Sequence, residues 1–248
     1  MNLSQFWKEN PKAAIAFSGG VDSAYLLYSA VQAGASVKAY YAKTVFQPAF
    51  ELADAKRLAS QLDVEMEILE PDILSVAYVS ENPANRCYYC KTALFSAMTA
   101  AAKRDGFTLI LDGTNASDDA SVRPGMQALR ELAVRSPLRE CGLTKPEIRR
   151  LSKEAGLFTH DKPAYACLAT RIPTGDAITP EKLARTEEAE TYLHSLGLRD
   201  FRVRTLGNLA RIQVTESDLE TVLKNREVIL SHLKKLYSGV MLDLEVRP

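Results

Sequence analysis

Two adjacent glycines follow a short apolar run near the start of the chain, within residues 18–23, whose sequence is SGGVDS. The apolar run, residues 13–17, has the length and character of a buried strand, and residues 24–31 read as a helix. Glycine lets backbone amides approach a polyphosphate without interference from Cβ, and a helix N-terminus adds unpaired N–H donors. This order of strand, loop and helix predicts an α/β domain with an anion-binding loop at the carboxyl end of its first strand.

The following segments repeat the alternation of short apolar strands and helices. Further strands are expected at residues 37–44, 64–69 and 107–111, and further helices at 49–62 and 93–104. Continuous apolar strands of about five residues that alternate with helices are typical of a parallel sheet covered on both faces. The fold class is therefore predicted to be α/β, with a parallel sheet between two layers of helices.

The last third of the chain follows a different pattern. A well-delimited helix is expected at residues 144–156, with Thr144 and Glu147 as a capping box and Gly156 just after its end. After an irregular, proline-rich stretch at 161–180, helices are expected at 181–196 and 218–236, and strands at 201–204, 210–214 and 240–246. We therefore expect a first domain at residues 1–177 and a small α+β domain at 178–248.

The overall composition is that of a globular protein and excludes some classes. Lysine plus arginine and aspartate plus glutamate number 31 each, so no bulk positive field attracts a long nucleic acid, and no nucleic-acid substrate is expected. No stretch reaches the roughly 18 consecutive apolar residues of a membrane-spanning helix, and no signal peptide is visible. A cytoplasmic location without membrane contact is the expectation, and the four cysteines are then expected to be reduced.

The chemistry of the glycine loop points to ATP. Ser18 and Ser23 offer hydroxyl donors, the backbones of Gly19 and Gly20 are free to approach phosphate, and Asp22 is expected to sit beside Mg²⁺, since a bare carboxylate repels phosphate. The string is neither a Walker loop nor a dinucleotide-binding glycine motif. It resembles the PP-loop of the N-type ATP pyrophosphatases, enzymes that cleave ATP to AMP and pyrophosphate and activate an oxygen by adenylylation.

A second glycine is expected at the same nucleotide. Gly113 lies in the sequence DGTN at residues 112–115, directly after the fourth predicted strand. Gly113 is assigned to cofactor binding with the glycine loop.

The cysteines carry the second signal. Cys87 and Cys90 form a C-x-x-C pair, for which a zinc site, a redox dithiol and an iron–sulfur cluster all stay open. Cys167 lies in an irregular segment, and with the pair it suits a [4Fe–4S] cluster that has one open iron. A Cys₃His zinc site that includes His160 is a weaker alternative, and Cys141 is interpreted as a small buried side chain.

Cys167 is also expected to be reactive by itself. Lys162 and Arg171 flank it in the sequence, and they would lower the pKa of its thiol if they face it.

Taken together, these motifs resemble the LarE family of ATP-dependent sulfur transferases, which assemble the nickel-pincer nucleotide cofactor of lactate racemase. The matching strings run in order from residue 18 to residue 212 and include SGGVDS at 18–23, RCYYCK at 86–91, DGTN at 112–115, RPG at 123–125, SPL at 136–138, ACLATRIP at 166–173 and RVR at 202–204.

The resemblance implies adenylylation of a carboxylate on pyridinium biscarboxylic acid mononucleotide, followed by sulfur delivery to form a thiocarboxylate. Arg202 and Arg204 match a basic pair that is proposed to hold the substrate phosphate, and Arg171 is assigned to the same site. Glu190 matches an acidic position near the active site. Gln213 stands where the family can carry a glutamate, which puts a divalent-metal site at that position in doubt. The family also implies a homo-oligomer, with the C-terminal domain as the contact surface.

Two mechanisms exist in that family. Either Cys87, Cys90 and Cys167 hold a [4Fe–4S] cluster that carries an extra sulfide from an unidentified donor, or Cys167 gives up its own sulfur. Because the second mechanism leaves the C-x-x-C pair without a role, the sequence favours the cluster. The rival functions are a tRNA thiolase, an ammonia-using ligase and a nucleotide-binding regulator without chemistry.

Overall fold

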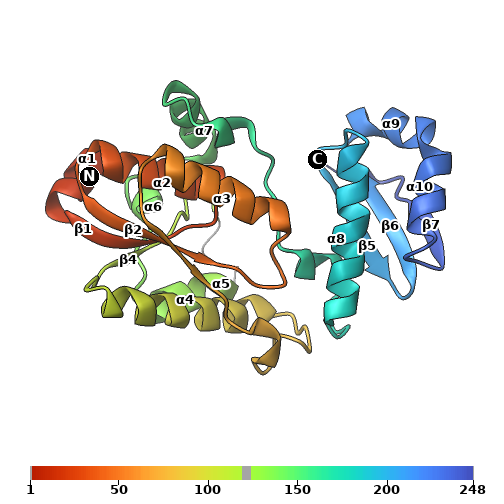
Figure 1. Cartoon of the computed structure of the whole chain (residues 1–248), viewed down its shortest axis with the longest axis horizontal. Helices are drawn as coiled ribbons and strands as arrows, with labels where there is room; N and C mark the ends of the chain where they lie inside the picture. The colour runs from red at the N-terminus through yellow and green to blue at the C-terminus, as the bar shows by residue number, and fades with distance from the viewer. Residues whose placement is uncertain (1, 119–123, 248) are drawn as a thin grey trace. The chain divides into compact units, whose positions relative to one another are not determined.

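The computed structural model describes residues 2–118 and 124–247, and the chain divides into two compact units. The first unit comprises Met1–Val79 and Asn85–Lys162, and the second comprises Ser80–Ala84 and Pro163–Pro248. Figure 1 shows the order of the elements along the chain. No helix among the described residues is both long enough and apolar enough to cross a membrane.

The first unit is built on a parallel sheet with the strand order β3-β2-β1-β4. Its strands are β1 (Lys12–Ala16), β2 (Ser36–Ala42), β3 (Met66–Leu69) and β4 (Ile110–Leu111). Its helices are α1 (Leu3–Glu9), α2 (Val21–Gln32), α3 (Ala49–Gln61), α4 (Arg86–Arg104), α5 (Pro124–Glu131), α6 (Pro137–Glu140) and α7 (Lys145–Glu154), with the 3-10 turns η1 (Ile73–Ser75) and η2 (Phe158–Asp161). The predicted α/β class, with a parallel sheet, is confirmed.

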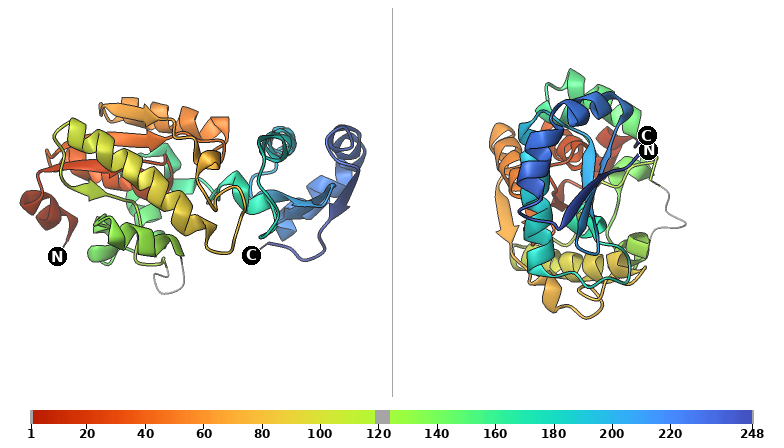
Figure 2. Two further views of the ribbon diagram at one scale, coloured as in Figure 1. Left: turned by 90° about the horizontal axis from the view of Figure 1, so that it is seen from below. Right: turned by 90° about the vertical axis from the view of Figure 1, so that its right-hand side faces the viewer.

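Helices cover both faces of this sheet, because successive side chains of a strand point to opposite sides (Figures 1 and 2). Ala13 and Ile15 of β1 belong to a core shared with α1, α2, α3 and α7. Ala14, between them, belongs to a second core shared with α4 and α5. The apolar run after Pro11 is therefore buried on both sides, as its lack of alternation predicted.

The second unit is a small α+β fold. Its sheet has the order β5 (Phe201–Leu206), β6 (Leu209–Val214) and β7 (Gly239–Leu242), with β5 antiparallel and β7 parallel to β6. The other elements are η3 (Leu168–Arg171), α8 (Pro180–Ser195), η4 (Glu216–Asp218), α9 (Leu219–Lys224) and α10 (Arg226–Leu233). Phe201, Val203 and Ile212 point to one face of the sheet and form a buried core with α8 and α10.

Several boundaries differ from those expected. The helix expected at 93–104 begins at Arg86, so it contains the C-x-x-C pair within its first two turns. The helix expected at 218–236 is divided at Asn225, the strand expected at 240–246 ends at Leu242, and α1 was not predicted. Terminal residues of elements are the part of a prediction that local sequence determines least.

The change of unit also lies earlier than the expected boundary near residue 178. Asn82 Nδ2 donates to the Pro173 carbonyl at 2.7 Å, and the amide of Ile178 donates to the Ser80 carbonyl at 2.7 Å. These bonds join the segment Ser80–Ala84 to residues just before α8, so the proline-rich stretch belongs with the second unit from Pro163 onward.

Candidate functional site

The glycine loop lies at the carboxyl end of β1, between that strand and α2. Gly19 has a φ of 71°, which favours glycine, and a Cβ at this position would lie 3.1 Å from the Ala55 Cα of α3. Both the backbone conformation and the tight packing therefore favour a glycine. Gly20 is the residue before α2, and no side chain caps the helix there, so its first amides are left for a ligand.

The two serines of the loop hold its shape. The Ser23 Oγ accepts a hydrogen bond from the Ser18 amide at 3.3 Å, lies 3.1 Å from the Ser18 Oγ and donates to the Gly20 carbonyl at 3.2 Å. The loop is closed on itself around these hydroxyls, which is a preorganised arrangement for binding an anion.

Gly113 contacts this loop directly. A Cβ on Gly113 would lie 2.8 Å from the Ser23 nitrogen, so only glycine allows the turn after β4 to approach the start of α2. β1 pairs with β2 on one side and with β4 on the other, which makes the gap between β1 and β4 the topological switch point where ligands bind in such sheets. Ser18, Gly19, Gly20, Asp22, Ser23 and Gly113 therefore lie together at this end of the sheet.

Asp22 has a partner that the sequence analysis did not identify. Lys145, the first residue of α7, places its Nζ 2.5 Å from the Asp22 Oδ2, and its amide donates to the Ser117 Oγ at 2.9 Å. The capping box of Thr144 and Glu147 that starts this helix is present as predicted. The capping box was the one feature of the sequence that pointed to Lys145, because it fixes the start of α7 and Lys145 is the first residue of that helix.

The surroundings of Asp22 fit a magnesium ion. Its other oxygen, Oδ1, is buried without a hydrogen-bond partner among the described residues. Mg²⁺ usually takes one or two carboxylates and completes its shell with water and substrate phosphate. Asp22 is thus the residue that would hold the ion against the ATP phosphates.

The C-x-x-C pair lies near the start of α4, within its first two turns. Cys87 is exposed, Cys90 is half-buried, and residues three apart on a helix lie on the same side. Cys167 belongs to the second unit. Among residues 2–118 and 124–247, no group of three or more histidine, cysteine, aspartate or glutamate side chains is gathered for a metal. Thiolates are the right donors for a cluster, and Cys87 and Cys90 lie three positions apart on one helix of the first unit, whereas Cys167 belongs to the second.

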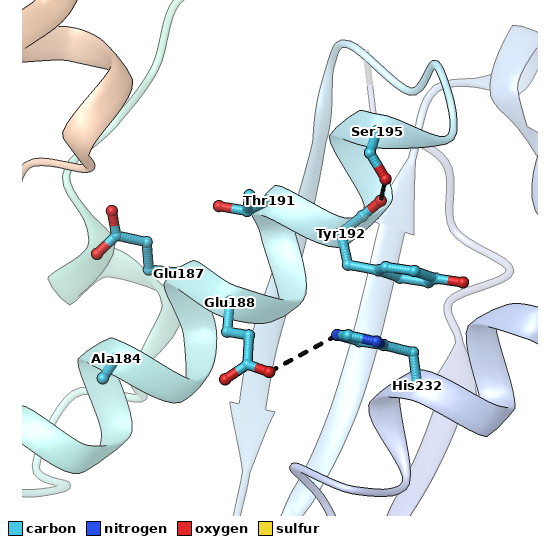
Figure 3. Close-up of a pocket in the computed structure, with 7 residues that line it drawn as sticks. All are labelled: Ala184, Glu187, Glu188, Thr191, Tyr192, Ser195 and His232. Carbon is cyan, nitrogen blue, oxygen red and sulfur yellow. Dashed lines mark hydrogen bonds and ion pairs between the residues drawn. The ribbon is translucent and has the colours of Figure 1, made fainter.

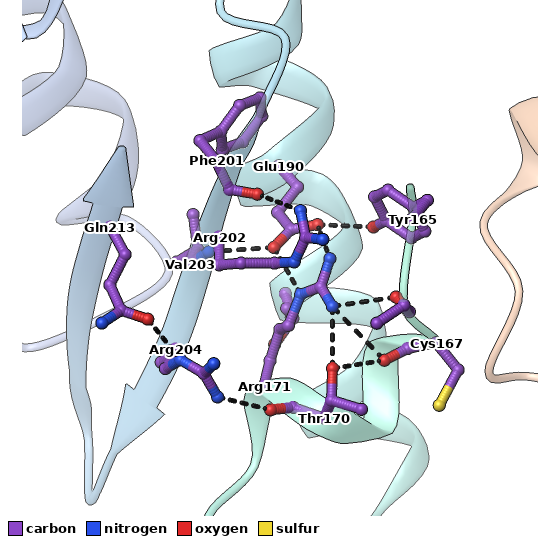
Figure 4. Close-up of polar contacts among 12 residues, drawn as sticks. Tyr165, Cys167, Thr170, Arg171, Glu190, Phe201, Arg202, Val203, Arg204 and Gln213 are labelled. Carbon is purple, nitrogen blue, oxygen red and sulfur yellow. Dashed lines mark hydrogen bonds and ion pairs between the residues drawn. The ribbon is translucent and has the colours of Figure 1, made fainter. Parts of the chain in front are cut away.

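The segment around Cys167 is held by a buried ion pair (Figure 4). The Arg171 side chain is fully buried, and its Nε and Nη2 donate to the two carboxylate oxygens of Glu190 at 2.7 and 3.0 Å. Burial opposes the charge of Arg171, but the hydrogen bonds and charge of Glu190 outweigh it, so the pKa of Arg171 lies above its ordinary value. Arg171 Nη1 donates to the Ala166 carbonyl at 2.8 Å and to the Cys167 carbonyl at 3.4 Å.

Arg171 therefore orients the backbone of Cys167. Figure 4 shows the Cys167 sulfur directed away from this guanidinium. Lys162, the other expected neighbour, belongs to the first unit and pairs with Asp54 at 2.6 Å.

Arg202 and Arg204 point from one face of β5 toward the same segment (Figure 4). Arg202 Nη2 donates to the Ala164 carbonyl at 2.9 Å, and Arg204 Nη1 donates to the Thr170 carbonyl at 2.9 Å. Burial, with help from the nearby arginines Arg171 and Arg247, lowers the pKa of Arg202 to about 10. Burial also lowers the pKa of Arg204. The closest partners of both guanidinium groups are neutral carbonyls, and Arg202 Nη1 also lies 3.6 Å from the Asp200 Oδ1. Guanidinium groups with neutral partners keep charge that an anion can use.

Cys141 lies at the edge of a hydrophobic core. It follows α6 and packs against the first core, and burial raises the pKa of its thiol. Arg123, at the start of the RPG string, lies outside the described residues.

A cavity of about 540 Å³ lies on the outside of α8 and α10. There His232 stacks on Tyr192 with ring centroids 3.8 Å apart (Figure 3). No predicted site residue lines this cavity.

The sheet order and the loop at its switch point define an ATP-binding α/β domain of the PP-loop type. No family model matches the chain. It is 37% identical over 250 residues to an uncharacterised protein of Synechocystis sp., a match that covers 98% of this chain and 92% of the relative. It is 32% identical over 240 residues to the pyridinium-3,5-bisthiocarboxylic acid mononucleotide synthase of Lactiplantibacillus plantarum, covering 96% of this chain and 87% of the synthase.

The chain belongs to the family of this synthase, the LarE family. A tRNA-specific 2-thiouridylase of Thermotoga petrophila is more distant, at 26% identity over 282 residues, with 90% of this chain and 79% of the relative covered. Both characterised relatives are named for sulfur-containing products. The predicted class, an ATP-dependent sulfurtransferase of the PP-loop type, is confirmed by this membership.

Proposed function

We propose that this chain adenylylates a carboxylate of pyridinium biscarboxylic acid mononucleotide and replaces the AMP with sulfur, giving a thiocarboxylate. The observation that carries the proposal lies in the second unit, where Arg202 and Arg204 both donate to the backbone of the segment that carries Cys167. A phosphate-binding pair beside a thiol suits a phosphorylated substrate that receives sulfur. The two domains first expected are accordingly assigned to ATP and to the substrate phosphate.

In the first step a carboxylate oxygen of the substrate attacks the α-phosphorus of ATP. A new P–O bond forms, the bond to the β-phosphate oxygen breaks, and pyrophosphate leaves. The backbone amides around Gly19 and Gly20 and the ammonium of Lys145 stabilise the charge on the departing pyrophosphate. Mg²⁺, held by Asp22, would neutralise part of the phosphate charge when bound.

In the second step sulfur displaces AMP from the acyl carbon. If the thiolate of Cys167 attacks, a thioester forms and AMP leaves. Loss of the Cα proton with cleavage of the Cβ–S bond then releases the thiocarboxylate and leaves dehydroalanine at residue 167. Arg202 and Arg204 hold the substrate phosphate meanwhile, so that the acyl carbon stays within reach of the sulfur.

A [4Fe–4S] cluster bound by Cys87, Cys90 and Cys167 would instead supply a sulfide that is not part of the polypeptide. The cluster mechanism is supported by the spacing of Cys87 and Cys90, which lie three positions apart on the same side of α4. Protein purified without oxygen should then contain about four irons per chain. The iron should be lost in Cys87→Ala and kept in the matched control Cys141→Ala. An iron-free protein that completes one turnover and converts Cys167 to dehydroalanine would contradict the cluster form and support the first.

The substrate is tested by pyrophosphate release. The chain is supplied with ATP and, separately, with the pyridinium biscarboxylate mononucleotide, tRNA or ammonia with a carboxylate acceptor. Release of pyrophosphate with the pyridinium nucleotide, together with a product heavier by sulfur in place of oxygen, is the expected result. Release with tRNA alone would contradict the proposal and would favour the function of the 2-thiouridylase relatives.

A homo-oligomer that forms through the second unit is also proposed, on the family resemblance. Sedimentation of the purified chain tests it, and a monomer at micromolar concentration would contradict it.

A further inference from the structure

The Arg204 side chain is held by a neutral amide where a carboxylate would be the usual partner. Its Nε donates to the Gln213 Oε1, and the Gln213 Nε2 donates to the Asp243 Oδ2 at 2.7 Å. Only one orientation of the amide satisfies both contacts, because Arg204 can only donate and the ionised carboxylate of Asp243 can only accept. Arg204, Gln213 and Asp243 therefore form a chain of hydrogen bonds from β5 over β6 to the residue after β7, which we call the relay (Figure 4 shows its first two residues).

The backbone register fixes the position of the relay. Gln213 of β6 lies directly opposite Arg202 and diagonal to Arg204, so all three side chains share the polar face of the sheet. Asp243 follows β7, and its amide donates to the Ile212 carbonyl at 2.8 Å, which brings its carboxylate beside β6. Arg211 lies on the same face, with its Nε 3.5 Å from the Asp243 Oδ2.

The amide positions Arg204 without cancelling its charge. A carboxylate at residue 213 would form a direct ion pair with Arg204, and it would also place a second negative charge against Asp243. In the present structure the Arg204 Nη1 is bonded to the Thr170 carbonyl, and among the described residues its Nη2 donates to no group. Two of the three guanidinium nitrogens are thus held, and Nη2 is left for an anion.

We propose that Gln213 is a specificity-determining residue: its neutral amide holds Arg204 in place while leaving the arginine charge for the phosphate of the substrate. The inference rests on the proposed function for the identity of that substrate. The role of Gln213 applies to any phosphate monoester, so phosphate binding can be measured without the proposed substrate.

The test is calorimetric titration of the full chain with two probes, inorganic phosphate and nicotinic acid mononucleotide, a pyridinium nucleotide that carries one phosphate. Gln213→Glu should weaken binding of both probes about tenfold, the size of a charge-assisted hydrogen bond. Gln213→Met removes the hydrogen bond to Arg204 and keeps the arginine charge. It should weaken binding of both probes by less than about fivefold. In turnover, Gln213→Glu should raise KM for the nucleotide and leave kcat almost unchanged.

Each result decides a different point. Binding by Gln213→Glu equal to that of the unmodified chain, or an equal loss in Gln213→Met, overturns the inference while the proposed function stands. Phosphate binding that depends on Gln213, without binding of the pyridinium nucleotide, supports the inference and contradicts the proposed substrate. A chain that binds neither probe overturns both. Circular dichroism of each variant shows that the altered chain is folded.

Discussion

Replacing Glu190 with glutamine tests how the segment that carries Cys167 is held. The carboxylate accepts four hydrogen bonds: Oε1 from Arg171 Nε and the Val203 amide, and Oε2 from Arg171 Nη2 and the Tyr165 hydroxyl. A glutamine has one acceptor oxygen, so whichever side its NH₂ takes, that group faces two donors. The Tyr165 hydroxyl can rotate to accept, but Arg171 cannot, and its buried charge is left without a counter-charge.

The expected cost is large because both partners are buried, with side-chain exposures of 0% for Arg171 and 5% for Glu190. Removing one member of a buried ion pair destabilises a protein by about 3–5 kcal/mol, which is a large part of the roughly 5–15 kcal/mol that holds a domain folded. With a slope of about 1.3 kcal/mol per molar urea, the unfolding midpoint of the second unit should fall by roughly 2–4 M.

Hydrogen exchange of peptides from β5 and β6, measured across a urea series, follows the second unit. The fluorescence of Trp7, the single tryptophan, follows the first unit. The matched control is Glu227→Gln in the same unit, since Glu227 pairs with Arg226 at the surface and should leave the midpoint unchanged. A midpoint shift in Glu190→Gln no larger than that of the control would refute the argument from burial.

Three further predictions concern the first unit. Gly113→Ala should raise KM for ATP at least tenfold, because its Cβ would meet the Ser23 nitrogen at 2.8 Å; an unchanged KM would show that the two loops move apart freely. Lys145→Met should slow pyrophosphate release about tenfold or more, since it removes the ammonium beside Asp22; Lys145→Arg should restore part of the rate, and equal rates in all three proteins would contradict the role. Hydrogen bonds to its neighbours hold the pKa of Asp105 below its ordinary value of 3.8, so its contribution to stability is present above pH 4 and is lost as the pH falls further. The difference in free energy of unfolding between the unmodified chain and Asp105→Asn should therefore shrink between pH 6 and pH 3, and a constant difference would refute it.

Local signals were sufficient for the strand and loop that begin the ATP-binding sheet of the first unit. An unbroken apolar run before SGGVDS predicts a strand buried on both faces, and Ala13, Ala14 and Ile15 contact two different cores as expected. The start of α4 was misplaced because the polar and aromatic residues after Asn85 do not show a helical pattern of apolar positions. The break at Asn225 was missed because the apolar periodicity continues through it.

The partners of the site residues were harder to predict than the residues themselves. Asp22 was expected beside a cation, but its neighbour Lys145 lies 123 positions away in the sequence, a contact that no local pattern encodes. In the same way Arg171 was assigned to binding, and its partner in the fold, Glu190, lies 19 positions away.

The sequence by itself determined the strand–loop–helix unit, the glycines that shape its loop and the class of chemistry. These follow from short-range properties: backbone freedom at glycine, apolar periodicity and the reactivity of thiols. The tertiary structure alone decided which charges are neutralised and which remain available. Arg171 is paired and Arg204 is held by a neutral amide because the register of β5 on β6 and the packing of α8 bring Glu190 to one and Gln213 to the other. Electrostatic pairing depends on distances between segments far apart in the chain, and only folding sets those distances.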